Sequence, residues 1–220
     1  MLDILFEENH YSKIIQKPIK NDLIITEEPY YEVRVPSIDC ILGDKLTAFA
    51  PHTTGIPFGV DKELEIIKQM YDVATLVDFI DNFEDIRKSY TRTVLSEIQY
   101  RGIATNEEEV LRDTLESALS IASRGQYGKD YDKYLRGIKS IITHVYDERF
   151  SAEKAAVMAC KVMHIAACLL KNISYKPIED YPSYLKAEIG NSKYSKLSKL
   201  RKFDIQGFAY VVKTIEILQE

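Results

Sequence analysis

The sequence predicts an α+β fold in which a small sheet near the N-terminus is followed by a mainly helical body. Short β-prone runs alternate with turn residues only within residues 1–36. From residue 37 onward, apolar residues recur at helical spacing and candidate caps separate the segments. The simplest division is therefore a mixed part over residues 1–80 and a helical domain over residues 81–220.

Composition indicates a globular protein without a strong surface field. The 220 residues are 45% hydrophobic, which is enough for a substantial core. A net charge of −5 means that no bulk positive charge would draw the chain to nucleic acid or to a membrane. No apolar run approaches about 18 residues, so we expect no transmembrane helix. Three cysteines without a C-x-x-C pair (Cys40, Cys160 and Cys168) indicate reduced core thiols in a cytoplasmic protein.

Three short runs in the N-terminal part are expected to form the sheet. Residues 1–6 are apolar and carry one carboxylate, Asp3. Residues 23–26 and 30–35 flank a Glu-Glu-Pro turn and are expected to pair as a hairpin beside that first strand. Because the sequence begins inside a strand, we expect that a further segment or a partner normally precedes it.

Two helices and a loop are expected next. Ser37 is a candidate N-cap for a helix over residues 37–50, and its apolar stripe consists of Ile38, Ile41, Leu42, Leu46 and Phe49. Residues 51–61 contain two prolines and two glycines and are expected to form a loop. A second helix is expected over residues 62–80, with one apolar face formed by Leu64, Ile67, Tyr71 and Ala74.

The remainder is expected to be helical. Asn106 is a candidate N-cap whose helix carries three glutamates in its first turn, where they complement the helix dipole. Ser151 is expected to begin an alanine-rich helix that ends near residue 171. Further helices are expected over residues 84–100, 129–146 and 205–218.

Lys45 is the first candidate for a functional residue because it falls inside the apolar stripe of the first helix. Its ammonium either reaches water along the helix edge or meets an anion such as a phosphate. Lys68 and Asp72 lie four residues apart on the second helix and therefore share one surface. Spacing alone also fits an ordinary surface ion pair.

Other polar groups carry weaker signals. Asp3 lies at a strand start and is a candidate magnesium ligand, as in enzymes of phosphoryl transfer. The histidines show no metal-ligand spacing; His144 and His164 are expected in the core, and His10 and His52 in loops. A basic cluster with nearby tyrosines either binds nucleic acid or, the interpretation that the acidic net charge favours, forms a solvated helix face. Its cations are Lys193, Lys196, Lys199, Arg201 and Lys202.

The segment over residues 36–78 resembles the AbiEii/AbiGii toxin family of nucleotidyltransferases. Pro36-Ser37 and the Lys45-Leu46-x-Ala48 run fit the first part of the family's pattern, and Lys68 and Tyr71-Asp72 fit the second. The resemblance implies a polymerase-β-like core and the toxin half of a type IV toxin–antitoxin pair. It covers residues 1–80 well.

The resemblance also implies roles. Lys45 and Lys68 would bind a nucleoside triphosphate, Asp72 would orient Lys45 or a polar group of the ligand, and Asp3 would hold Mg²⁺. The nucleotide would pass to an acceptor such as tRNA, and a cognate antitoxin is an expected partner.

One part of the family's pattern is missing from the sequence. The G-S pair followed by D-x-D, which supplies two of three metal-site carboxylates, does not occur in the chain. A two-metal site needs these groups. We therefore expect a truncated or degenerate enzyme that is inactive as this chain. The alternative is a non-catalytic helical module that binds a protein such as an antitoxin.

Overall fold

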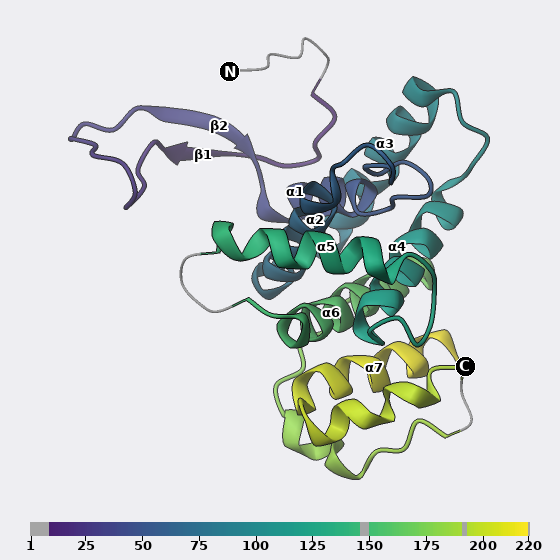
Figure 1. Cartoon of the computed structure of the whole chain (residues 1–220). Helices are drawn as coiled ribbons and strands as arrows, with labels where there is room; N and C mark the ends of the chain where they lie inside the picture. The colour runs from purple at the N-terminus through teal and green to yellow at the C-terminus, as the bar shows by residue number, and fades with distance from the viewer. Residues whose placement is uncertain (1–8, 146–149, 191–192, 220) are drawn as a thin grey trace.

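The computed structural model describes residues 9–145, 150–190 and 193–219. Within them, a two-stranded antiparallel sheet precedes a helical body, which agrees with the expected α+β class. Figure 1 shows the sheet extending from the helices as an arm, with its second strand leading into the first helix. The strand expected over residues 1–6, together with Asp3, lies outside the described residues.

The sheet pairs β1 (Ile14–Pro18) with β2 (Glu32–Pro36), so that Ile15 lies opposite Val35. The expected pairing of residues 23–26 with 30–35 is therefore wrong. Residues 21–24 turn instead, because the Asn21 side chain accepts a hydrogen bond from the backbone N–H of Leu23 at 2.7 Å. The apolar residues Leu23, Ile24 and Ile25 are exposed to solvent, and they form part of the long connection between the two strands.

The helices begin close to where their caps predict. Ser37, Asn106 and Ser151 each accept a hydrogen bond from a first-turn backbone N–H and so cap the helices α1 (Ile38–Ala48), α4 (Glu107–Ala122) and α6 (Ala152–Leu170). The remaining long helices are α2 (Glu63–Leu76), α3 (Phe83–Arg101), α5 (Tyr131–Ile141) and α7 (Ile205–Leu218). Short 3₁₀ helices are η1 (Val77–Phe79), η2 (Ile142–His144), η3 (Tyr181–Lys186) and η4 (Ser195–Lys202).

Two expected helices are shorter than their sequence patterns indicate. The second helix tightens into η1 after Leu76. The helix expected from residue 129 begins at Tyr131, because Asp130 adopts a left-handed backbone conformation with φ 63° and cannot join the helix. The buried face of α2 is also shifted from the expected one: Leu64 and Tyr71 are only half-buried, while Met70 is fully buried.

The hydrophobic core lies between α4 and α6, with α1 packed on α3, α2 on α5 and α7 on α6. Gly43 permits a close approach of α1 and α3, because a Cβ atom at this position would lie 2.5 Å from the carbonyl oxygen of Ile86. The core contains side chains from both sides of residue 80, and the domain boundary expected there stays a prediction. The three cysteines are free and buried, as expected.

Within the described ranges, no helix combines the length and the apolar character that crossing a bilayer requires.

Candidate functional site

Lys45 and Asp72 meet where α1 packs on α2. Lys45 lies in the last turn of α1, between the fully buried Leu42 and Phe49. Its Nζ lies 3.0 Å from Oδ2 of Asp72 and donates a hydrogen bond to Oε1 of Gln69 at 3.1 Å. Of the two alternatives left open for Lys45, water at the helix edge or an anion, the structure shows an anionic partner on the neighbouring helix for a side chain that is still partly exposed.

This pair remains accessible from solvent. The side chain of Lys45 is 31% exposed and that of Asp72 is 40% exposed. Solvent screens the attraction between two such groups, so the pair contributes about 1 kcal/mol or less to folding. An ammonium group has three N–H donors, and the contacts to Asp72 and Gln69 occupy two of them. The third is not used by any described residue and is available to a ligand oxygen.

Lys68 is half-buried on α2, one turn before Asp72. Among residues 9–145, 150–190 and 193–219, no ion pair or hydrogen bond joins it to the Lys45 pair. The structure thus brings together two of the three predicted site residues on these helices. Gln69 is the contact that the sequence did not reveal, because helical spacing does not show which side chains of α2 face α1.

The described part of the chain contains no group of three or more His, Cys, Asp or Glu side chains that could hold a metal ion. The expected ligand Asp3 lies outside that part. The described carboxylate at the pair, Asp72, already contacts Lys45. The described residues therefore do not by themselves form a magnesium site.

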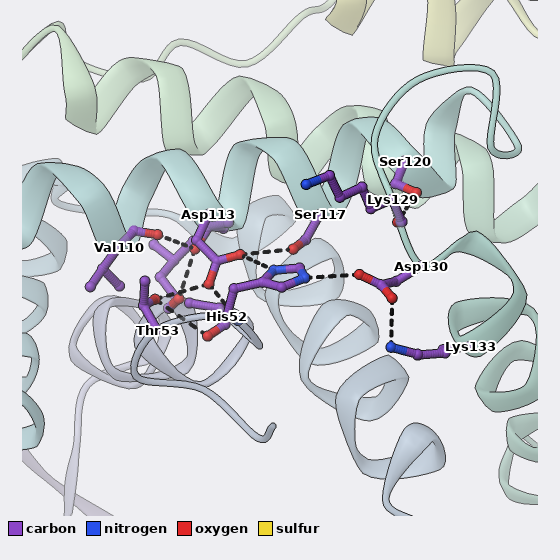
Figure 2. A network of polar contacts seen from close by, with 12 residues as sticks. His52, Thr53, Val110, Asp113, Ser117, Ser120, Lys129, Asp130 and Lys133 are labelled. Atoms are coloured by element: carbon purple, nitrogen blue, oxygen red, sulfur yellow. Dashed lines mark hydrogen bonds and ion pairs between the residues drawn. The ribbon is translucent and has the colours of Figure 1, made fainter. Parts of the chain in front are cut away.

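A second polar cluster surrounds His52, in the loop between α1 and α2. Its ring lies between two carboxylates, with Nδ1 2.7 Å from Oδ1 of Asp113 and Nε2 3.1 Å from Oδ2 of Asp130 (Figure 2). The backbone N–H of His52 donates to Oδ2 of Asp113 at 2.8 Å, and the hydroxyl of Thr53 donates to the same oxygen at 2.9 Å. Lys133 in turn contacts Asp130 at 2.6 Å. This His52 cluster ties the loop to α4 and α5.

The charges of the cluster decide what His52 can do. The hydrogen bond to Asp113 raises the pKa of His52 to about 9, against the opposing effect of burial, and Asp130 adds to the rise. Lys133 and then His52 lower the pKa of the Asp130 carboxyl. His52 is therefore a cation at neutral pH, and a group that holds its proton so firmly is poorly suited to act as a general base there. The cluster is best explained as a clamp on the loop.

The positions of the other histidines agree with the sequence analysis in all cases but one. His144 was expected in the core but is exposed in η2, because the helix that would have buried it ends at Ile141. His164 is 3% exposed, as expected for a core residue. Burial, and to a smaller extent the charge of Lys213, lower its pKa to about 4. The expectation of loop positions for His10 and His52 is confirmed.

Comparison with known proteins assigns the chain to a family. The model of the family described as nucleotidyl transferase AbiEii toxin, type IV toxin–antitoxin system, matches residues 1–153, which include Lys45, Asp72 and His52. No curated protein and no solved structure matches the chain. Because the match covers more than half of the 220 residues, this chain belongs to the AbiEii family of nucleotidyl transferase toxins.

Proposed function

We propose that the protein is a nucleotidyltransferase toxin whose reaction transfers a nucleotide from a nucleoside triphosphate to an acceptor such as tRNA, and that this chain, which lacks the G-S and D-x-D motif of the family, forms the nucleotide-binding part of that enzyme. The observation that carries the proposal is the Lys45–Asp72 pair, which lies within the family-matched residues and joins two helices at an accessible position. A cognate antitoxin is the protein partner that a type IV system suggests. Family membership favours this function over that of a non-catalytic binding module.

Lys45 would bind the triphosphate. Its remaining N–H donor can reach a phosphate oxygen while Asp72 and Gln69 keep the side chain in place. The partly buried stem limits the rotamers that the ammonium can adopt. A fixed cation of this kind stabilises the negative charge that develops on the phosphate oxygens during transfer.

Asp72 would serve as the positioning residue for Lys45, and Lys68 would add a second cation to the same surface. Lys68 suits this role because no described carboxylate contacts it. Mg²⁺ with Asp3 as a ligand is part of the same proposal, on the ground of family resemblance. The steps assigned to Lys45, Asp72 and Lys68 do not depend on it.

Transfer is tested by incubating the full chain with each α-labelled nucleoside triphosphate, magnesium and total bacterial RNA, and by measuring the label that enters RNA. We expect Lys45→Ala to lower the transfer rate about 100-fold or more, the usual result of removing one electrostatic contact to a transition state. Asp72→Asn keeps the shape of the side chain but removes its charge, so it should lower the rate less.

Lys139→Ala is the matched control, because Lys139 is exposed on α5 and forms no ion pair with a described residue. Thermal shift by each triphosphate separates binding from chemistry, since a ligand that binds only the folded state raises the melting temperature. Equal thermal shifts by a triphosphate, or equal and measurable transfer rates, for the wild type and Lys45→Ala would refute the proposed role of Lys45. A chain that neither binds any triphosphate nor labels RNA would refute the proposed function.

A further inference from the structure

The short helix η4 arranges its side chains in columns. It is a 3₁₀ helix, in which residues three apart lie directly above one another at intervals of about 6 Å. Lys196, Lys199 and Lys202 therefore form one column, and all three are exposed. A neighbouring apolar column consists of Leu197, Leu200 and Phe203. Its first residue, Leu197, is buried and its last, Phe203, is exposed. A basic edge thus runs beside an apolar edge.

A pocket of about 660 Å³ opens beside η4, between the end of α4 and the start of α6. Both columns contribute to it, Lys196 and Lys199 from the first and Leu197, Leu200 and Phe203 from the second. Its remaining apolar wall comes from Ala122, Ala156 and Val157. Phe203 is 83% exposed, which places a large aromatic side chain in solvent beside the lysines.

The net charge around this pocket is positive once the acids that line it are matched with their partners. Two acids line it, and both are engaged: Glu153 accepts a hydrogen bond from Arg124, and Asp204 caps α7 by accepting one from the backbone N–H of Gly207 at 2.9 Å. Lys199 and Lys202 form no ion pair with any residue of the described ranges. The pocket therefore offers cations along one edge of an apolar recess, in a chain whose net charge is −5.

We propose that this surface binds single-stranded nucleic acid, with a base inserted beside Phe203 and the phosphates along the column of Lys196, Lys199 and Lys202. An apolar pocket with an exposed aromatic ring suits the face of a base, and a row of lysines suits a phosphodiester backbone. A duplex fits less well because its bases are already stacked and paired. The lysine column and Phe203 lie outside the family-matched residues 1–153, and binding at this site requires neither a nucleoside triphosphate nor transfer.

The test is fluorescence anisotropy with labelled oligo-U RNA and oligo-dU DNA of about 12 nucleotides, within the usual range of site sizes. Both strands carry the phosphates and bases that the pocket recognises, so we expect both to bind, and tighter binding of RNA would assign contacts to the 2′-hydroxyl. The triple variant Lys196→Gln, Lys199→Gln, Lys202→Gln should bind more than tenfold more weakly. It should also flatten the slope of log K against log salt by about 2, since each phosphate contact on a single strand contributes about 0.7.

Phe203→Ala should weaken binding about 5-fold to 100-fold without changing the salt slope, because it removes stacking and not charge. Replacing the same three lysines by arginine should keep the binding. The matched control replaces three exposed lysines elsewhere, Lys62, Lys139 and Lys171, by glutamine and should leave affinity close to wild type. All replaced side chains are exposed, and equal melting temperatures verify that the variants fold.

The proposal is overturned if neither strand binds at about 50 mM salt, where electrostatic binding is strong. It is equally overturned if the η4 lysine variant binds no more weakly than the control, or if Phe203→Ala has no effect. Because nucleotide and magnesium are omitted, failure of the transfer assay above would not change the interpretation of this one.

Discussion

Replacing His52 by glutamine tests the clamp on the loop between α1 and α2. Glutamine retains hydrogen-bonding capacity but cannot carry the positive charge that attracts Asp113 and Asp130. The rise of the His52 pKa from 6.5 to about 9 would correspond to about 3 kcal/mol for a fully buried group, at about 1.36 kcal/mol per pKa unit. The side chain is 47% exposed, so solvent screening reduces the expected contribution to about 1–2 kcal/mol.

The sign of the pH dependence follows from the raised pKa. Below pH 6.5 the ring is protonated in both the unfolded and the folded chain, and the full contribution is present. As the pH rises through about 9 the folded chain loses this proton, and the contribution disappears. The variant should therefore melt about 2–8 °C below wild type near pH 6 and at nearly the same temperature near pH 10.

His10→Gln is the matched control, because the His10 side chain is exposed and its ring forms no hydrogen bond or ion pair with a residue of the described ranges. It should leave the melting temperature unchanged at both pH values. A gap between wild type and His52→Gln that is as large near pH 10 as near pH 6 would show that the ring contributes through shape and not through charge, and the electrostatic reasoning would be wrong.

Three further predictions concern packing, a buried histidine and the nucleotide. Gly43→Ala should destabilise the fold by about 1–3 kcal/mol in urea denaturation, because its Cβ would overlap the Ile86 carbonyl, whereas Gly207→Ala meets only ordinary contacts and should be neutral or stabilising. As the pH falls from 6.5 to 4, the wild type should lose on the order of 3 kcal/mol of unfolding free energy, because the buried His164 ring, whose pKa is lowered to about 4, takes up a proton only in the unfolded chain. His164→Phe should not show this loss. Lys45→Ala should abolish the thermal shift caused by a nucleoside triphosphate with little change in the melting temperature of the free protein, given the exposed pair.

Local signals in the sequence predicted the helical body well. The caps at Ser37, Asn106 and Ser151 act through hydrogen bonds within a single turn, so three or four residues contain the information. The loop over residues 51–61 was equally well predicted from its prolines and glycines. Strand pairing was not, because residues 14–18 and 32–36 meet across a long connection and the Asn21 turn removes the nearer candidate from the sheet.

The candidate sites show the same division between local and distant information. Lys45 could be found because a charge within an apolar stripe is visible at helical spacing. The cluster around His52 could not, since Asp113 and Asp130 are far from it in sequence and only the packing of α4 and α5 brings them together. The one local signal was a histidine in a loop rich in threonine, which does not identify its partners.

The clamp at His52 and the Lys45–Asp72 pair are connected through the loop between α1 and α2. The loop that His52 anchors connects α1, which carries Lys45, to α2, which carries Asp72. It is also held against the end of α1, where the hydroxyl of Thr54 donates to the carbonyl oxygen of Thr47 at 2.9 Å. Fixing this connection restricts how the two helices can slide past each other, and the 3.0 Å contact between Lys45 and Asp72 depends on that register. Loss of the His52 charge should therefore weaken triphosphate binding in proportion to the mobility that the loop gains, and less than Lys45→Ala does at the same pH.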